Sequence, residues 1–554
     1  MRILLLYKSH PGGARDPYTS LLPTGLGYLA AFLGENGFRP RLANLSATSW
    51  KEAETFLAHN RPDMVCISQF THNRAESVRL AALAKKLNPG CVTLLGGPHA
   101  THAFSAILER HPEVDGVVLG EGEETVLAIA RLVARRERNF SSVPGLACRG
   151  GGRIIHAARQ PLVDLDSLPF PVHGYGDVWG CDIHRQLEFI ITSRGCPAAC
   201  RFCSSPRFWG QGLRFRSPRS MVDEIRLLRD RYGLLYFSFR DDTFTVRPER
   251  VIEFCRLLLE EKVHIRWCCQ SRVNCVDEEM LLWMRRAGCE CVQYGVESGS
   301  ERILKSLGKR ITPEQVRQAA RATRRAGIEV SVYLITGVPG ETDEDVRATV
   351  RLVNDILPHD GQVSPLAYYP GTALFADAVR QGVVPADLFE REQGEALFVR
   401  HDPFVARSTG TLLQALERTG RKARFGPSDF TAQRKLLGFC YATALAVGEW
   451  HQEQGDDGRA EGAYRELTER EPGNPWGWLA LGGLFGEGGE VGRAEEAFGK
   501  ALALVPLHIP ALLALGDLRL MAGDRRGARR HYERARELEP ESGEVRARLK
   551  SLGG

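Results

Sequence analysis

A 34-residue spacing in the last part of this 554-residue chain constrains its fold more tightly than any other sequence feature. Four markers recur in phase: Gly448, Gly482 and Gly516; Ala460, Ala494 and Ala528; Tyr464, Phe498 and Tyr532; and Pro472, Pro506 and Pro540. Small residues let paired helices approach, the aromatic residue is expected to fill the gap between repeats, and proline ends the second helix. The spacing therefore predicts three stacked helix pairs over residues 441–554.

This period and pattern resemble tetratricopeptide repeats. Such repeats stack into a concave surface, which favours a protein partner, a peptide substrate or a carrier-bound substrate. The alternative is that the repeats only cap or brace the rest of the chain. A polar, basic connector is expected to precede them at residues 406–440.

Short apolar segments alternate with helical segments over residues 1–150, which predicts a doubly wound, Rossmann-like α/β domain. Ligands of such sheets bind at the carboxyl ends of the strands. Four glycine-rich or polar loops fall at or near these ends: Thr24–Gly27, Gln69–Asn73, Gly96–Ala100 and Gly120–Glu124. Any one glycine could simply turn the chain, but together the loops indicate a binding site. A linker is expected at residues 151–185.

Six further strand and helix units follow over residues 186–405, which predicts a partial (β/α)6 barrel with its active site at the carboxyl ends of the strands. The helices carry clear start signals. Ser217 precedes Pro218, Thr312 precedes Pro313, and Thr342 is followed by Asp345 in a capping-box spacing.

Three cysteines, Cys196, Cys200 and Cys203, lie in one loop directly after the first of these strands, in the sequence "TSRGCPAACRFCSS". Structural zinc usually takes four protein ligands, whereas an iron–sulfur cluster held by three thiolates leaves one iron free to bind a substrate. Phe202 is expected to shield such a cluster. The alternative is an unrelated zinc or disulfide loop.

Composition and charge exclude several classes of protein. The 73 basic and 68 acidic residues leave a net charge of +5, which does not favour nucleic acid or an anionic membrane as partner. No signal peptide is visible, and no apolar run approaches the roughly 18 residues of a membrane span. Fourteen cysteines in so long a chain are not a disulfide framework. We expect a cytoplasmic protein without an integral membrane segment.

The CxxxCxxC loop after the first strand of a six-unit barrel resembles the radical S-adenosylmethionine (SAM) superfamily. The resemblance implies a 4Fe–4S cluster that gives one electron to SAM and produces a 5′-deoxyadenosyl radical. It also implies a reductant protein such as flavodoxin or ferredoxin. The positions that would bind SAM end successive strands: Asp241 or Asp242 for the amino group, Gln270 and Arg272 with Arg272 on the carboxylate, Glu297 for the ribose, and Gly337 for the adenine. The alternative for each charged residue is a salt bridge at the barrel rim.

The segments "LGYLAAFLGENGF", "LLGGPHAT" and "GVVLGEGEET" match, in order, the cobalamin-binding radical SAM family. The two resemblances cover roughly residues 1–400. The DxHxxG motif is absent, which fits members that hold cobalamin without a histidine on cobalt and members that have lost the cofactor. The implied cobalamin contacts are Gln69, Thr71, Gly96, Gly97, Pro98 and Glu121.

This resemblance implies methylation of an unactivated carbon through methylcobalamin, with Tyr368 and Tyr369 on the substrate side. One alternative is a related radical enzyme that performs oxidative cyclisation, ring contraction or carbon–carbon coupling. Another is a non-enzymatic cobalamin sensor or scaffold. Five further cysteines show no second cluster spacing and are expected to be apolar filler: Cys268, Cys269, Cys275, Cys289 and Cys291.

Overall fold

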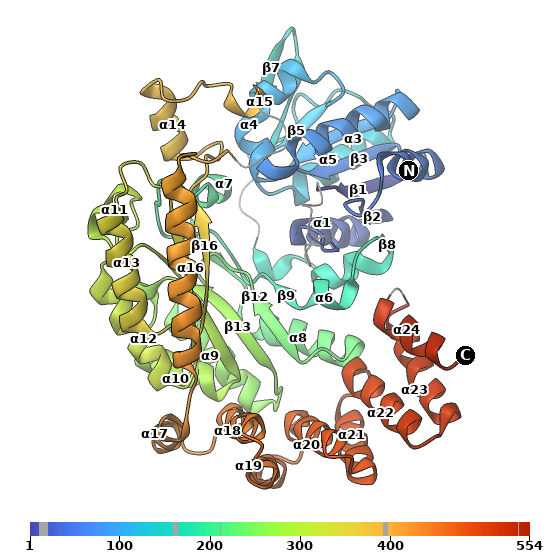
Figure 1. Ribbon diagram of the computed structural model, residues 1–554. Coiled ribbons are helices and arrows are strands. Elements are labelled where there is room, and N and C mark those ends of the chain that lie inside the picture. Colours follow the sequence, from blue (N-terminus) through green and yellow to red (C-terminus); the bar gives the residue numbers. More distant parts are fainter. Residues whose placement is uncertain (10–19, 159–163, 211, 392–396, 541, 554) are drawn as a thin grey trace.

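The computed structural model describes residues 1–9, 20–158, 164–210, 212–391, 397–540 and 542–553. Three parts follow one another along the chain (Figure 1). An α/β unit lies at the top of the view, a second α/β unit lies in the middle, and a helical array lies below it. The molecule is therefore α/β with an all-helical C-terminal part, as the sequence predicts.

The first unit is built on an eight-stranded sheet in the order β7-β6-β5-β4-β3-β1-β2-β8. Its strands are β1 Ile3–Tyr7, β2 Pro40–Asn44, β3 Met64–Ser68, β4 Val92–Gly96, β5 Gly116–Val118, β6 Leu146–Gly150, β7 Arg153–His156 and β8 Val178–Trp179. Its helices are α1 Thr24–Glu35, α2 Trp50–Asn60, α3 Arg74–Leu87, α4 Pro98–Arg110 and α5 Glu123–Ala134. Strand order reverses between β1 and β3, the place where doubly wound sheets bind ligands.

Alternate residues of the central strands fill two apolar cores, one on each face of this sheet. Ile3 and Leu5 of β1 belong to one core, and Leu4 and Leu6 belong to the other. Strands covered on both faces read as continuous apolar runs, which is why the sequence identifies them.

The segment predicted as a linker, residues 151–185, differs from that expectation where the structure describes it. It adds β7 antiparallel to β6 at one edge of the sheet and β8 parallel to β2 at the other. A 3₁₀ segment, Pro171–Gly176, packs on α1, where Gly27 lies under the Tyr175 ring. These strands are short and half-polar, so their pattern resembles a loop. Residues 159–163 lie outside the described residues.

The second unit is a partial barrel of six parallel strands in the order β16-β15-β14-β13-β12-β9. The strands are β9 Phe189–Ile190, β12 Tyr236–Phe239, β13 Arg266–Ser271, β14 Cys289–Glu297, β15 Glu329–Thr336 and β16 Asp360–Pro365. The helices between them are α8 Pro218–Tyr232, α9 Pro248–Glu260, α10 Glu278–Arg286, α11 Glu301–Ser306, α12 Pro313–Arg325 and α13 Asp343–Ile356. Ser217 and Thr312 cap α8 and α12 as their sequence signals predict.

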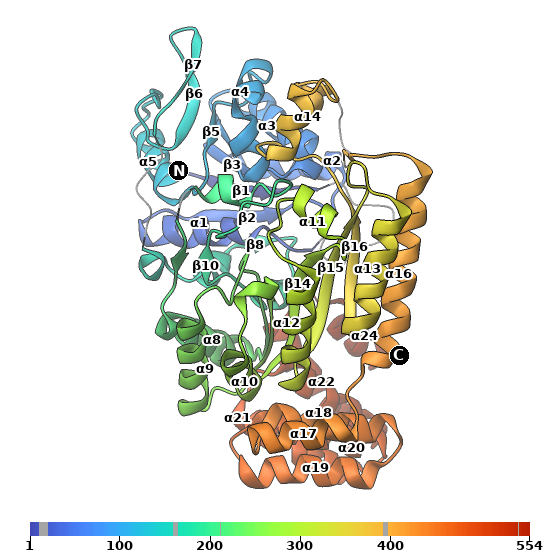
Figure 2. The same ribbon diagram turned by 90° about the vertical axis from the view of Figure 1, so that its left-hand side faces the viewer.

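Residues 406–440, predicted as a polar connector, fold into helices instead. Helix α16 (Pro403–Ala423) lies along the open edge of the barrel and packs on α13 and β16, followed by α17 (Pro427–Leu437) (Figure 2). Leu412 and Leu416 are buried on one face of α16, and basic residues on the other face give the segment its polar composition.

The C-terminal array consists of three helix pairs and a final helix. They are α18 Tyr441–Glu453, α19 Asp457–Arg470, α20 Pro475–Glu487, α21 Val491–Leu504, α22 Ile509–Met521, α23 Arg525–Leu538 and α24 Gly543–Ser551. The repeated aromatic residue packs on the repeated glycine of its own pair rather than between repeats. A Cβ at Gly448 would overlap the Tyr464 ring, and one at Gly482 would lie 2.8 Å from Phe498. The glycine therefore sets how closely the two helices of a pair approach.

The array lies under the amino ends of the barrel strands and contacts them along one edge (Figures 1 and 2). The Tyr441 hydroxyl donates to the carbonyl of Ile265, just before β13, at 2.6 Å. Further along, the backbone of Leu507 packs against Gly233, just before β12. The repeats thus brace the base of the barrel. Among the described helices, none is long and apolar enough to cross a membrane.

Candidate active site

The three-cysteine loop joins β10 (Ser193–Arg194) to α7 (Ser205–Trp209), beyond the carboxyl end of β9. Cys196, Cys200 and Cys203 are partly exposed and form no disulfide. The start of the loop is fixed because β10 pairs antiparallel with β11 (Arg214–Phe215). Within the loop, the amide of Cys203 donates to the carbonyl of Cys200 at 3.3 Å. The fold therefore presents three free thiols at the carboxyl edge of the barrel.

The surroundings of these thiols suit a metal cluster. A guanidinium nitrogen of Arg272, at the end of β13, lies 3.5 Å from the sulfur of Cys200. Burial raises the pKa of Cys203 to about 12, so its thiolate needs a bound cation to form at neutral pH. In the described part of the chain no three His, Cys, Asp or Glu side chains are already gathered at metal-binding distances.

The two aspartates expected to hold the SAM amino group face other partners. Asp241 is 1% exposed and accepts hydrogen bonds from the amides of Thr192 and Ser193 at 2.6 and 3.0 Å. It fixes the strand that leads into the cysteine loop. Asp242 accepts from the hydroxyl of Ser205 and from the indole of Trp209, so it holds α7.

The remaining residues expected to bind SAM end β13, β14 and β15. Gln270 donates to the hydroxyl of Tyr333 at 3.3 Å inside the barrel. Glu297 has a left-handed backbone, with φ of 67°, and its buried carboxylate accepts from Lys309 at 2.7 Å. Gly337 also has a positive φ, and its amide donates to Glu341 at 2.7 Å. Positive φ in a glutamate is uncommon and is typical of functional sites.

Apolar side chains surround one side of the cysteine loop. Phe202 packs on a small buried cluster that contains Ile303, Leu307 and Val338. Of the two tyrosines expected on the substrate side, Tyr368 is buried and Tyr369 is 44% exposed. Four of the five further cysteines lie within the barrel strands, and Cys268, Cys269 and Cys289 are buried there.

A buried ion-pair network joins the cysteine loop to the first unit. Arg194, two residues before Cys196, binds Glu121 and Glu123 at 2.6 Å each. Arg214 of β11 also binds Glu121. The sequence predicts that Glu121 contacts cobalamin; its carboxylate binds these two arginines, and the residue also lines the cavity beside this network. No sequence signal points to Arg194, because a lone arginine beside a cysteine motif has no characteristic spacing.

Directly beside this network, a cavity of about 120 Å³ opens at the carboxyl ends of β3, β4 and β5. Gly96 and Gly97 line one side of it, and Phe208 and Trp209 of α7 close the other. Gly97 has φ of 100° and a Cβ there would lie 2.8 Å from the carbonyl oxygen of Gln69, so only glycine fits this turn. At about 120 Å³ the cavity is smaller than the roughly 300–1,000 Å³ of ordinary ligand pockets, so it could enclose only part of a cofactor held between the two units.

The other residues expected to contact cobalamin lie around the start of α4. Pro98 is its first residue. The hydroxyl of Thr71 lies 3.1 Å from the ring of His99. This ring is buried, and burial lowers the pKa of His99 to about 3. The side-chain nitrogen of Gln69 donates to Ser77 at 2.9 Å, whereas its buried side-chain oxygen has no partner among the described atoms. That oxygen is an acceptor free for a ligand.

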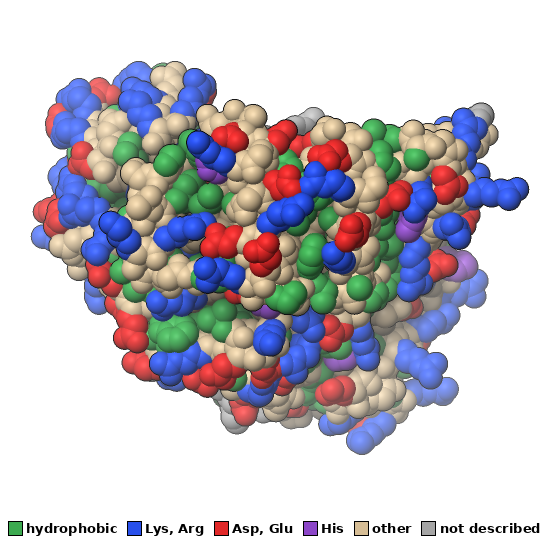
Figure 3. Space-filling model, turned by 90° about the horizontal axis from the view of Figure 1, so that it is seen from below, with side chains coloured by type: hydrophobic (Ala, Val, Ile, Leu, Met, Phe, Trp, Pro, Cys, Tyr) green, Lys and Arg blue, Asp and Glu red, His purple; other side chains and the backbone are tan. Residues whose placement is uncertain are grey.

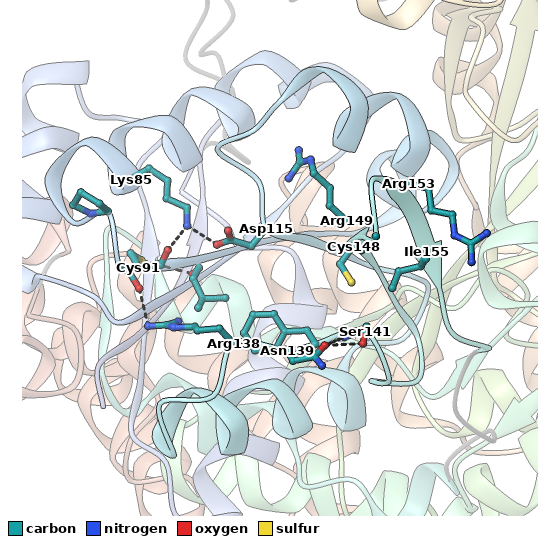
Figure 4. Close-up of a pocket in the computed structure, with 16 residues that line it drawn as sticks. Lys85, Cys91, Asp115, Arg138, Asn139, Ser141, Cys148, Arg149, Arg153 and Ile155 are labelled. Atoms are coloured by element: carbon teal, nitrogen blue, oxygen red, sulfur yellow. Dashed lines mark hydrogen bonds and ion pairs between the residues drawn. The ribbon is translucent and has the colours of Figure 1, made fainter.

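A larger cavity of about 1040 Å³ lies at the opposite end of the first sheet (Figure 4). Its polar side chains are engaged with the protein: Lys85 binds Asp115 at 2.7 Å, and Arg138 donates to the carbonyl of Gly90 at 2.9 Å. It lies beside the amino ends of the strands, remote from the cysteine loop, so it is not the candidate cofactor site.

Comparison with known proteins finds the same two units. Residues 190–353 match the Radical SAM superfamily, and residues 15–130 match the B12 binding domain. The chain is 30% identical over 368 residues to the uncharacterized methyltransferase PH0819 of Pyrococcus horikoshii, covering 65% of this chain and 79% of that protein. It is 27% identical over 391 residues to the anaerobic magnesium-protoporphyrin IX monomethyl ester cyclase of Rubrivivax gelatinosus, covering 68% and 70%.

Among solved structures, the chain is similar to the radical SAM methyltransferase TsrM from Kitasatospora setae with cobalamin and a 4Fe–4S cluster bound. The TM-score is 0.61 at 19% identity, and the match covers 84% of this chain and 99% of that chain. At this identity the likeness supports the fold.

Proposed function

Because this chain belongs to the radical SAM superfamily, in the group that carries a B12-binding domain, we propose that it is a cobalamin-dependent methyltransferase acting on an unactivated carbon. The proposal rests on one observation, that the cysteine loop of the second unit lies beside a cavity of the first unit. The three-cysteine loop and the cavity under Gly96 and Gly97 lie on either side of Arg194 and α7. A cluster and a cobalamin bound there would lie close together at the junction of the two units.

When bound, the 4Fe–4S cluster supplies an electron for cleaving SAM, and cobalamin supplies a methyl carrier. The chain's own residues position these groups and exclude water. Cys196, Cys200 and Cys203 bind the iron, and Arg272 places a positive charge beside them. Phe202 and Trp209 provide apolar cover on two sides of the loop.

The test needs no substrate. We would load the protein with iron, sulfide and hydroxocobalamin without oxygen, reduce it, add SAM, and measure S-adenosylhomocysteine in a single turnover. A methyltransferase should form about one equivalent per bound cobalamin, because SAM must first methylate the carrier. Full retention of cobalamin with no S-adenosylhomocysteine would contradict the proposal.

A second candidate is a radical enzyme that does not transfer methyl, favoured by the similarity to the Rubrivivax gelatinosus cyclase. Such an enzyme should form 5′-deoxyadenosine from SAM without S-adenosylhomocysteine. The product ratio therefore separates the two candidates.

We also infer that the enzyme takes its electrons from a small reductant protein of the flavodoxin or ferredoxin type, and that it works in the cytoplasm. The free cysteines support this location, because thiols stay reduced there.

The proposed domains are a cobalamin-binding domain (1–150) with the adjoining segment 151–185, a radical SAM barrel (186–405), two connecting helices (406–440) and three tetratricopeptide repeats (441–554).

A further inference from the structure

Helix α23, in the last repeat, carries an unusual concentration of positive charge. Its sequence, "RRGARRHYERAREL", has six arginines and two glutamates, a net charge of +4 within a chain whose total is +5. All six arginines are exposed, and we call them the α23 arginine surface: Arg525, Arg526, Arg529, Arg530, Arg534 and Arg536. In Figure 3, Lys and Arg side chains project from the right-hand rim, on the side where Figure 1 places α23 and α24.

The repeat fold does not require this charge. The equivalent helix of the first pair, α19, has three arginines and four acidic residues, a net charge of −1. In the second pair, α21 has one arginine, one lysine and two glutamates, a net charge of zero. All three helices keep the same small and aromatic packing residues, so the arginines of α23 serve some purpose other than packing.

The charges of this surface are mostly unneutralised. Arg534 binds Glu537 at 2.7 Å and Arg529 lies 4.0 Å from Glu533. No carboxylate among the described residues lies within ion-pair distance of the other four arginines.

The arrangement also opposes the stability of the helix. Arg525 and Arg526 occupy the first turn, where the helix dipole disfavours positive charge. Arg526, Arg530 and Arg534 follow one another at i, i+4 spacing, where like charges repel. An unfavourable arrangement of this kind is typical of a binding surface, whose partner supplies the missing negative charge.

Guanidinium groups bind carboxylates and phosphates through paired hydrogen bonds. Two observations favour carboxylates on a protein here. Glu533 and Glu537 interrupt the surface, so a continuous phosphate backbone would meet them, whereas spaced carboxylates on a peptide can bypass them. Among the described residues of α22–α24, no Phe, Tyr or Trp is exposed for bases to stack on, whereas Met521, which ends α22 beside this helix, is 68% exposed.

We propose that the α23 arginine surface binds an acidic segment of a partner protein. The segment presents carboxylates along about 12 Å of one helical face, to match Arg526, Arg530 and Arg534, and an apolar residue for Met521. The surface lies on the array at the amino ends of the barrel, and the cysteine loop lies at the carboxyl ends (Figure 1). The surface is therefore remote from the cysteine loop, and the proposal is independent of the reaction catalysed.

The test uses the full chain and two labelled peptides of identical composition. One peptide carries its glutamates at i, i+4 and i+8 with one leucine beside them, and the other carries the same residues spread around the helix. Fluorescence anisotropy should show the first peptide binding at least about tenfold more tightly to the wild type than to R526E/R530E/R534E. The matched control R407E/R418E/R421E, on exposed residues of α16, should bind within about twofold of the wild type.

Circular dichroism and thermal melting would show that both triple variants stay folded. Equal binding of the first peptide by the wild type and by R526E/R530E/R534E would overturn the proposal. So would equal binding of the two peptides, or tighter binding of a single-stranded oligonucleotide or of anionic vesicles through the same three arginines.

Discussion

Arg194 illustrates how one side chain can serve two units. It is 6% exposed, it binds Glu121 and Glu123 of the first unit, and its guanidinium also lies 5.2 Å from the Tyr28 ring. We expect R194Q to destabilise the protein by about 3–5 kcal/mol, because it leaves the buried carboxylate of Glu123 without its ion-pair partner, whereas Glu121 keeps Arg214. Urea unfolding would measure this. R207Q, on an exposed residue of α7, is the matched control and should change stability by less than about 0.5 kcal/mol; equal effects would contradict the assignment.

The same network predicts a dependence on pH. Burial alone would raise the pKa of Glu123, but Arg194 outweighs it and holds the pKa below its usual value. A lowered folded-state pKa gives stability that is present above the unfolded value, about 4.3, and is lost as pH falls through the folded value. In R194Q burial should raise the pKa instead. The stability difference between wild type and R194Q should therefore shrink as pH falls, first through the raised pKa of the variant above about 4.3, and then through the lowered pKa of the wild type below it. If the difference in stability between the two proteins stayed constant as pH falls, Glu123 would not be its cause.

The cysteine assignment is tested by metal content. We expect C200A, reconstituted without oxygen, to lose most of its bound iron and its charge-transfer absorbance, because one of three ligands is missing. C275A, on a partly exposed cysteine outside the loop, should keep both. Iron analysis and the visible spectrum would measure the outcome, and an unchanged iron content in C200A would exclude the loop as the cluster site.

At the scale of elements, the glycine of each helix pair sets how closely the helices pack. G448A should destabilise the protein by about 1–3 kcal/mol, because the added methyl group overlaps the Tyr464 ring. G462A, in the interior of α19 with no atom within 4 Å of the added methyl, should stabilise it by about 0.5–1 kcal/mol. Thermal melting of the two variants would compare them. If G448A stabilised the protein, the two helices of the pair could move apart at no cost in free energy.

Elements with a strong local signal were predicted well and those without one were not. The strands β1, β3 and β4 are buried and mostly apolar, and α8 and α12 have clear caps. By contrast, β7 and β8 are short edge strands whose composition is that of a loop, and α16 shows its apolar stripe only every third or fourth residue among charged ones. What defines these elements is the surface they pack on.

At the scale of the whole molecule, the repeats act as a base for the barrel. Arg285 is buried at their interface and donates to the carbonyl of Ala442 at 2.9 Å. A chain that ends at Phe439 should therefore expose a buried charge, melt at a lower temperature and aggregate on heating. Scanning calorimetry and light scattering would measure this. A truncated chain with the melting temperature of the full protein would leave the repeats with no bracing role.

The sequence by itself determined the chemistry and the kinds of units in this protein. Thiolate spacing, apolar runs and the 34-residue period are local patterns, and each is written in consecutive residues. Only the tertiary structure decided which groups meet. In the fold, Asp241 accepts a hydrogen bond from the amide of Thr192, Glu121 forms ion pairs with Arg194 and Arg214, and the repeats lie under the barrel. These contacts join residues that are distant in the chain. The sequence around a charged residue therefore does not indicate which opposite charge will be buried beside it in the fold.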